Sequence, residues 1–386
     1  MQGNELAQGV TTGTISLMLG HPDPETLFTP EFQEAAQRVI AAPEPYQSLQ
    51  YGAERGTPAL IDYLVEKFNR EQATTLTADD FMLVAGSTHA VDMTARLCAG
   101  QGEVVIVEAP SYVDALHVFR DHGVELYSTA MDHAGIIPQK LEQLLAMLKA
   151  RQKRPRFLYT IPNFHNPMGV TLAEARRFEI DRLAQQYGFV IVEDDVYRDL
   201  AFGGDVPRSF VAMGAPALHI GSFSKTLAPG LRLGWLVGSR DLIKRFVCCG
   251  TSEMGGGANP FVAQIVAEYC RQGHWERHVS HLRDVYRRRR DTMLAALDQY
   301  MPAGVQWTKP GGGFFIWVTL PEHVQGREVK VRALERGVLV AAGEGFFVNP
   351  TEGARNLRLT YSFARLEDIV VGVRILGEII ADQMKT

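Results

Sequence analysis

The feature that most constrains the fold is a repeated alternation of short apolar runs with longer segments of helical periodicity. Each run has the length of a single strand, and most are bounded by Gly, Pro or Asp. The pattern predicts strands at 81–86, 103–108, 157–161, 188–193, 217–221 and 233–237, and helices at 88–99, 111–122, 138–150, 171–187 and 259–272. Strands that alternate with helices indicate an α/β fold with a mostly parallel, buried sheet.

The last third of the chain follows a different pattern. It predicts a long charged helix at 275–300 and a closing helix at 364–384. Between them it predicts three short strands, at 313–319, 338–341 and 356–361. This is an α+β arrangement, and 386 residues suffice for a large and a small domain. We therefore predict three parts: an N-terminal segment (1–46) that joins the small domain, a large domain (47–275) and a small domain (276–386).

Charge and cysteine content exclude several classes of protein. The net charge of −5 argues against a nucleic-acid partner, so the arginines of 287–290 are interpreted as a solvated helix face. No apolar stretch reaches the length of a membrane span, and no signal peptide is recognisable at the start. We expect a cytoplasmic protein that binds no metal and has reduced core thiols, namely Cys98, Cys248, Cys249 and Cys270.

The segment 221–234 (GSFSKTLAPGLRLG) carries the most specific chemistry. Small and hydroxyl residues surround Lys225, and Arg232 follows seven positions later. The residue directly before the lysine is Ser224 and not a glycine, so this is not a P-loop, and no dinucleotide fingerprint occurs in the chain. A lone loop lysine is usually solvated. Here, however, Ser222, Ser224 and Arg232 can donate hydrogen bonds to a phosphate beside an imine-forming lysine.

A second segment, 192–197 (VEDDVY), closes an apolar strand, where ligands of open α/β sheets gather. Asp194 can lie buried there and pair with the N–H of a protonated ring. Tyr197 can donate to an oxygen of the same ring. The alternative is that the acids cap the next helix, an interpretation that suits Asp195 better than Asp194.

Two further segments lie between a strand and a helix. In 86–89 (GSTH), Ser87 and Thr88 stand at a helix N-terminus, which is an anion site, although Ser87 can also act simply as a cap. In 109–112 (APSY), Tyr112 offers a flat face on which a planar ring can stack. A partly buried core tyrosine is the alternative.

The last two segments concern a turn and a strand. Two prolines and a glycine make 162–169 (PNFHNPMG) a tight turn, from which Asn166 can reach the ring oxygen. His165 is interpreted as a turn or surface histidine. In 356–361 (NLRLTY), Arg358 lies within an apolar strand and needs a partner, either a substrate carboxylate or a structural acid.

In this order and spacing, the six segments resemble the fold-type I, pyridoxal-phosphate (PLP)-dependent aminotransferases of class I/II. Within that family the chain is most similar to the 2-aminoadipate and kynurenine aminotransferase-like group, through 49–60 (LQYGAERGTPAL) and 345–348 (GFFV). The resemblance covers about residues 15 to 380. It implies transfer of an amino group from an L-amino acid to a 2-oxo acid by a ping-pong mechanism. A PLP-dependent lyase or decarboxylase on the same fold, and a non-catalytic PLP-binding regulatory domain, are the alternatives.

The resemblance also implies a role for each candidate residue. Lys225 would hold PLP as a Schiff base and move the proton, Asp194 would hold the ring nitrogen, and Tyr197 and Asn166 would bond the ring oxygen. Tyr112 would stack on the ring. The phosphate would be bound by Ser87, Thr88, Ser222, Ser224, Arg232 and, from a neighbouring subunit, Tyr51. Substrate would be bound by Arg358, Asn166 and Gly20, in a homodimer with shared active sites.

Overall fold

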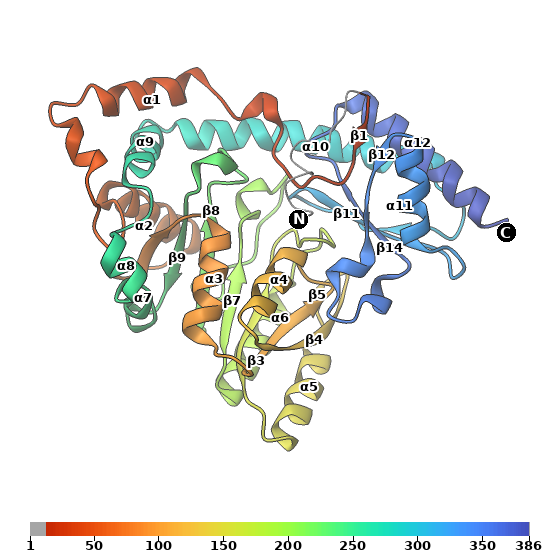
Figure 1. Ribbon diagram of the computed structural model, residues 1–386, viewed down its shortest axis with the longest axis horizontal. Coiled ribbons are helices and arrows are strands. Elements are labelled where there is room, and N and C mark those ends of the chain that lie inside the picture. Colours follow the sequence, from red (N-terminus) through yellow and green to blue (C-terminus); the bar gives the residue numbers. More distant parts are fainter. Residues whose placement is uncertain (1–12, 386) are drawn as a thin grey trace.

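A computed structural model describes residues 13–385, and its centre is an eight-stranded sheet (Figure 1). The strand order is β2-β9-β8-β7-β6-β3-β4-β5. The strands are β2 (Phe81–Val84), β3 (Val104–Ala109), β4 (Glu125–Asp132), β5 (Gly135–Ile136), β6 (Pro155–Thr160), β7 (Val190–Asp194), β8 (Ala217–Ser222) and β9 (Gly234–Gly238). All six strands expected here from the sequence are present.

The five inner strands β8, β7, β6, β3 and β4 are parallel, and β9, β2 and β5 are antiparallel to their neighbours. The carboxyl ends of the parallel strands therefore meet at one edge. The segments that follow β3, β6, β7 and β8 are those in which the sequence indicated chemistry.

Side chains of the sheet alternate between two apolar layers. On β3, Val105 and Val107 join a cluster that contains α3 and α4, whereas Val104 and Ile106 join a cluster that contains α5 and α6. Because successive side chains of a strand point to opposite faces, the unbroken apolar runs are explained by helices on both faces. These helices are α3 (Ser87–Cys98), α4 (Val113–Asp121), α5 (Pro138–Ala150) and α6 (Glu174–Tyr187).

A further group of helices covers the end of the sheet at β2 and β9. Apolar side chains of α1, α2 and α9 form a cluster of their own with the two strands, whereas Ile243 and Phe246 of α7 join the cluster that contains α3 and α4. In Figure 1 they lie on the left: α1 (Pro30–Ile40), α2 (Pro58–Gln72), α7 (Arg240–Val247), α8 (Gly250–Gly255) and α9 (Pro260–Arg271).

The long helix α10 (His274–Tyr300) leads from this group to the C-terminal part (Figure 1). There, a four-stranded antiparallel sheet has the order β10-β11-β14-β13, and two helices accompany it. Their bounds are β10 (Gln306–Trp307), β11 (Phe315–Thr319), β13 (Ala341–Ala342), β14 (Asn356–Thr360), α11 (Gly326–Glu335) and α12 (Leu366–Gln383). The N-terminal strand β1 (Ile15–Ser16) pairs in parallel with β12 (Val338–Leu339).

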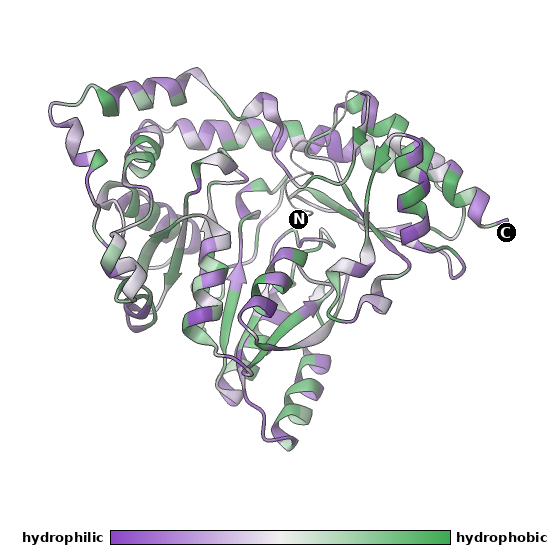
Figure 2. Cartoon of the chain, in the orientation of Figure 1, coloured by the Kyte–Doolittle hydropathy of each residue, from purple (hydrophilic) through white to green (hydrophobic). Residues whose placement is uncertain are grey.

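Short 3₁₀ turns connect several of these elements. They are η1 (Pro24–Thr26), η2 (Pro45–Leu49), η3 (Ala78–Asp80), η4 (Arg198–Leu200), η5 (Pro229–Leu231), η6 (Gly343–Phe346) and η7 (Pro350–Gly353). Figure 2 shows that the central strands are mostly hydrophobic, whereas the helices carry both hydrophobic and hydrophilic residues. Within residues 13–385, no helix is both long and apolar enough to cross a bilayer.

Four expectations about the fold need correction. Strand β4 was not expected, because most of its residues are only half-buried and its sequence lacks an apolar run. The strand expected at 338–341 is two strands in different sheets. Arg289 is not solvated: it is buried, and its Nη2 lies 2.6 Å from Asp23 Oδ2. Cys248 is exposed, whereas the other three cysteines are buried thiols as expected.

Candidate active site

A cavity of about 560 Å³ opens where the parallel strands end. This volume is typical of small-molecule sites. All the site residues expected from the sequence line it except Ser222 and Tyr51: Gly20, Ser87, Thr88, Tyr112, Asn166, Asp194, Tyr197, Ser224, Lys225, Arg232 and Arg358. The β-α alternation thus gathers residues from distant parts of the sequence around one cavity.

Lys225 follows β8 and reaches across the cavity to the N-terminal segment. Its Nζ donates to the carbonyl oxygen of Gly20 at 2.9 Å. Among the described residues it has no carboxylate within ion-pair distance. Burial, and then the nearby charge of Arg358, lower the pKa of Lys225 to about 8. A larger share of this amine is therefore neutral near neutral pH than for an ordinary lysine.

Two adjacent acids at the end of β7 have different surroundings. Asp195 accepts from Asn163 Nδ2 at 2.7 Å and from Arg198 Nη1 at 3.4 Å, so both of its oxygens are engaged. Among the residues that the structure describes, Asp194 accepts only from Tyr159, at Oδ2, and its buried Oδ1 has no partner. Burial raises the pKa of Asp194 to about 6. Asp194 is therefore the acid with a free oxygen, and Asp195 does not cap the next helix as the alternative interpretation required.

Arg358 on β14 is held without an acidic partner. Its Nη1 donates to Asn166 Oδ1 at 2.9 Å and its Nη2 donates to the Met18 carbonyl at 2.7 Å, while Nε has no partner. The guanidinium carbon lies 4.5 Å from the ring centre of Phe315 and 5.0 Å from that of Phe346. No carboxylate lies within ion-pair distance among residues 13–385. The alternative of a structural salt bridge is thus not realised, and burial lowers the pKa of Arg358 to about 10.

Polar side chains on other loops complete the middle of the cavity. Tyr197 is buried, and burial raises its pKa above the ordinary value, although Arg358 and a hydrogen bond with Asn166 oppose this shift. Tyr112 follows β3, and its hydroxyl donates to Asp114 Oδ2 at 2.6 Å. Asn166 stands in the turn after β6, where the Asn166–Pro167 peptide is cis.

One end of the cavity is rich in hydrogen-bond donors. Ser87 and Thr88 begin α3, so its first N–H groups lie free of helical partners. Arg232 approaches the same end, where its Nη2 donates to the Ala85 carbonyl at 3.3 Å. A Cβ on Gly86, whose φ is +86°, would lie 2.7 Å from this Nη2, so only glycine leaves the arginine its place.

Two predicted residues do not line the cavity. Ser222 is buried directly beside it, and its Oγ donates to Ser224 Oγ at 2.9 Å. Tyr51 is 80% exposed on the loop before α2. The position of Tyr51 agrees with a role outside its own subunit, and that role stays a prediction.

Sequence reasoning missed several groups near the site. His165 is fully buried, not a surface residue, and its Nε2 lies 2.9 Å from Glu108 Oε2. Its Nδ1 accepts from Met168 N, so Nε2 carries the proton and donates to Glu108. Tyr159 was also missed. The available signal was a hydroxyl and a carboxylate inside buried strands, where each needs a partner.

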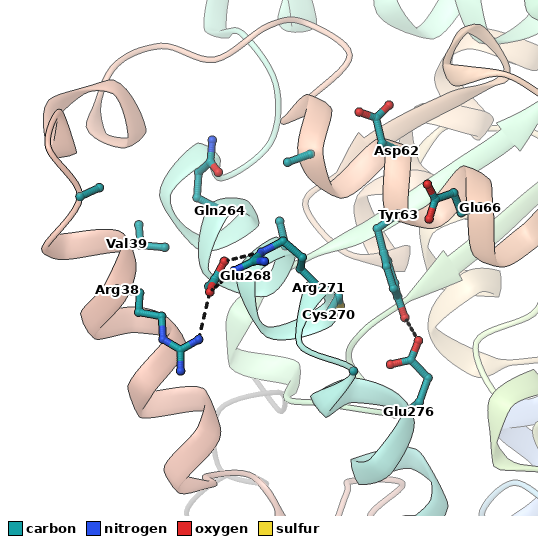
Figure 3. A pocket seen from close by; sticks show the side chains of 14 residues that line it. Arg38, Val39, Asp62, Tyr63, Glu66, Gln264, Glu268, Cys270, Arg271 and Glu276 are labelled. Carbon is teal, nitrogen blue, oxygen red and sulfur yellow. Dashed lines mark hydrogen bonds and ion pairs between the residues drawn. The ribbon is translucent and has the colours of Figure 1, made fainter.

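A larger cavity, of about 670 Å³, lies elsewhere, between α1, α2, α9 and α10 (Figure 3). Many of its charged groups are already paired. Arg38 and Arg271 both bond Glu268, at 3.2 and 3.0 Å, and the Tyr63 hydroxyl donates to Glu276 at 2.5 Å. None of the predicted site residues lines it. The smaller cavity is therefore the candidate active site.

The donor set of this smaller cavity fits PLP. The free Oδ1 of Asp194 suits a protonated pyridine nitrogen, and the donors at the start of α3 suit a phosphate. Within residues 13–385, the Lys225 amine has no acidic partner and the buried guanidinium of Arg358 has no carboxylate partner. These four features match an amino-acid substrate and a carbonyl cofactor.

Comparison with known proteins agrees with this chemistry. Residues 15–371 match the family described as aminotransferase class I and II. Aromatic-amino-acid aminotransferase 1 from Thermococcus litoralis is 34% identical over 377 residues, which cover 97% of this chain and 90% of the relative.

Two solved structures are similar along almost the whole chain. The kynurenine aminotransferase of Pyrococcus horikoshii, in complex with PMP, has a TM-score of 0.93 at 33% identity, covering 100% of this chain and 95% of that one. The α-aminoadipate aminotransferase LysN of Thermus thermophilus, complexed with N-(5'-phosphopyridoxyl)-L-leucine, has a TM-score of 0.87 at 30% identity, covering 98% and 95%. The fold is accordingly that of the fold-type I PLP enzymes. The chain belongs to the class I and II aminotransferase family, as an enzyme that transfers amino groups with pyridoxal phosphate as its cofactor.

Proposed function

We propose that this aminotransferase works at the cavity around Lys225, with an α-amino acid as donor and a 2-oxo acid as acceptor. One observation carries the proposal: Lys225, which has no acidic partner in the described part of the chain, and the buried Asp194, which has one oxygen unpartnered there, line the same cavity. A lysine and an acid of this kind are the two groups that hold PLP at its carbonyl and at its ring nitrogen.

The remaining residues divide by position. Ser87, Thr88, Ser224 and Arg232 would bind the phosphate, with Ser222 orienting Ser224 through their 2.9 Å hydrogen bond. Asn166 and Tyr197 would bond the ring oxygen, and Tyr112 would stack on the ring. The support is that these side chains lie in or beside the cavity and are donors or flat rings.

Substrate binding is assigned to Arg358, Asn166 and Gly20. Arg358 has a fixed guanidinium between two aromatic rings and no acid of the described chain as a partner, which suits a substrate carboxylate. A Cβ at Gly20 would come within 2.9 Å of Phe315, so this glycine lets the N-terminal segment pass close to the cavity.

The chain's own groups then account for the proton movements. Bound PLP supplies an electron sink for the electrons left at Cα. The Lys225 amine, once free, takes the proton from Cα and returns it during transfer. Asp194, as an anion, keeps a proton on the ring nitrogen. Arg358 holds the substrate carboxylate, so that Cα stays within reach of Lys225.

We further propose a homodimer with shared active sites. Large apolar side chains are exposed over the segment that includes Tyr51: Phe28 (66%), Ile40 (59%), Tyr46 (62%) and Leu49 (72%). A run of this kind marks an interaction surface. Sedimentation should give a dimer, and Tyr51→Ala should weaken PLP binding. A monomer with full activity would contradict this proposal.

Two organisational proposals accompany it. We propose a large domain over 47–275 and a small domain over 276–386, which the segment 1–46 joins. The pairing of β1 with β12 supports this for the first strand of the segment, whereas α1 packs against α9 of the large domain. Only residues 13–385 carry that support. We also propose a cytoplasmic location, which suits four cysteines that form no disulfide.

The function is tested by recording the absorbance of the purified holoenzyme before and after single amino acids are added without acceptor. A donor should convert the visible band to that of the amino form of the cofactor, and a 2-oxo acid should restore it. Accumulation of an elimination or decarboxylation product, with the visible band retained, would favour the lyase alternative instead. Lys225→Ala should show neither the band nor its conversion.

A further inference from the structure

Tyr159 makes a single directed contact with the acid at the end of β7. Its side chain is fully buried, and its hydroxyl donates to Asp194 Oδ2 at 2.6 Å. Phe119 packs edge-on against its ring, with 5.3 Å between centroids. The phenol is thus fixed in the core and meets the active site only through this hydrogen bond.

The register of the sheet explains why the two residues meet. Tyr159 on β6 pairs with Val192 on the parallel neighbour β7. Asp194 lies two residues further along β7, so its side chain points to the same face as that of Val192. Tyr159 and Asp194 are diagonal neighbours on this face, a separation that a long aromatic side chain can bridge.

The hydrogen bond leaves the carboxylate with two different oxygens. Oδ2 is taken by the phenol, whereas Oδ1 is buried and unpartnered in a residue that lines the cavity. A carboxylate held at one oxygen cannot easily exchange its two oxygens by rotating. The free oxygen is therefore held in one place, in a residue that lines the cavity.

The charged groups around Asp194 act in opposite directions. Burial raises its pKa most, and the hydrogen bond from Tyr159 is the largest influence that lowers it. Asp195 raises the pKa further, whereas Lys225 and His219 lower it. Tyr159 itself does not ionise in this range, because burial raises its pKa well above the ordinary value. The phenol is thus a constant donor.

We propose that Tyr159 is a positioning residue that keeps Asp194 ionised, with Oδ1 turned toward the ring nitrogen of bound PLP, and so keeps that nitrogen protonated. This inference rests on the proposed function, in which Asp194 holds the ring nitrogen. It adds the source of the carboxylate's orientation and charge. Tyr159 touches neither substrate nor cofactor in this account.

The test is the protonation state of the cofactor nitrogen in holoenzyme loaded with ¹⁵N-labelled PLP, read as its NMR chemical shift against pH. In the unchanged enzyme the nitrogen should lose its proton only toward the alkaline end of the stable range, which gives its apparent pKa. In Tyr159→Phe its apparent pKa should fall by roughly one unit or more, because a hydrogen bond to a charged group changes an equilibrium constant by about tenfold or more. The Kd for PLP should rise by roughly tenfold or more for the same reason.

Tyr361→Phe is the matched control. Tyr361 is also fully buried, and its hydroxyl donates to the Gly312 carbonyl at 2.9 Å, so this variant loses one buried hydrogen bond without touching Asp194. It should leave the ¹⁵N titration unchanged. A shift of the same size in both variants would overturn the proposal, because the effect would then follow from general loosening of the core.

Asp194→Ala distinguishes a failure of the role proposed for Tyr159 from a failure of the role proposed for Asp194. A neutral nitrogen in this variant, with Tyr159→Phe titrating as the unchanged enzyme does, would overturn the role of Tyr159 alone. A protonated nitrogen in Asp194→Ala would overturn the proposed role of Asp194 and this inference with it. If Tyr159→Phe does not fold, 3-fluorotyrosine at position 159 serves instead: a stronger donor should raise the nitrogen's apparent pKa, and a fall would contradict the proposal.

Discussion

Arg358 on β14 and Asn166 in the turn after β6 are bonded to each other across the cavity, with 2.9 Å between Nη1 and Oδ1. They stand 192 positions apart in the sequence. One is assigned to the substrate carboxylate and the other to both substrate and ring oxygen. This hydrogen bond therefore links the substrate end of the site to the cofactor end.

Removing the fork at Arg358 should weaken substrate binding far more than cofactor binding. Arg358→Gln should lower kcat/KM for the amino donor by roughly 100-fold, as expected when a bidentate, charge-assisted pair is lost. Arg358→Lys keeps the charge but loses the bidentate geometry of the guanidinium. Its kcat/KM should lie between that of Arg358→Gln and that of the unchanged enzyme. Steady-state kinetics and PLP titration provide the measurements. An unchanged KM in Arg358→Gln would show that the carboxylate is bound elsewhere.

The two acids at the end of β7 should respond differently to removal. Asp194→Ala should lower kcat by roughly 100-fold or more, since the ring nitrogen loses its counter-charge in a buried site. Asp195→Ala should act mainly on stability, because its partners are Asn163 and Arg198. Rates and melting temperatures of both variants decide the matter. If Asp195→Ala were the slower enzyme at equal folding, the assignment of Asp194 would be wrong.

The raised pKa of Asp194 predicts a pH-dependent cost in the apoenzyme. The folded state holds its proton up to about pH 6, whereas the ordinary value is 3.8, so ionisation destabilises the folded state. This cost is absent below the pKa that Asp194 has in the unfolded state and is complete above the pKa that it has in the folded state. Asp194→Asn removes it. Its gain in free energy of unfolding over the unchanged apoenzyme should therefore grow by about 3 kcal/mol between roughly pH 4 and pH 6.

Urea titrations of both apoenzymes at several pH values measure this difference. Only the change of the difference with pH is diagnostic, because the amide can shift stability by a constant amount. A difference that is flat from about pH 4 to pH 7 would mean that burial does not affect the proton of Asp194.

The lowered pKa of Lys225 predicts how fast the apoenzyme takes up PLP. Only the neutral amine attacks a carbonyl, so the rate should rise with pH and level off above about 8, the pKa of this amine. An ordinary lysine would still be gaining reactivity above about pH 10. Stopped-flow absorbance measures the rate, with a small model amine run in parallel to remove the titration of PLP itself. A rate that follows the model amine would contradict the lowered pKa.

Much of the fold followed from periodicity, because buried parallel strands leave apolar runs. The glycine- and serine-rich stretch around Lys225 located the site, since its residue types are specific to a phosphate beside an amine. Strand β4 was not predicted, because its residues are mostly half-buried and form no apolar run. The hydrogen bonds of Tyr159, Glu108 and His165 depend on which strands are neighbours, and no local pattern reveals strand order.

The burial of Arg289 is another consequence of tertiary contacts. Its partner Asp23 is 266 positions away, and nothing within the charged helix distinguishes Arg289 from the arginines beside it. Local sequence therefore predicts which residue types a site contains better than it predicts which members of a run are buried.

The central claim is that Lys225 holds the cofactor. The most direct test is to reduce the holoenzyme with borohydride, digest it and locate the phosphopyridoxyl group by mass spectrometry. The phosphopyridoxyl group is expected on the peptide that contains Lys225, and Lys225→Ala treated in the same way should yield no labelled peptide. A label on another lysine, or none on the active enzyme, would contradict it.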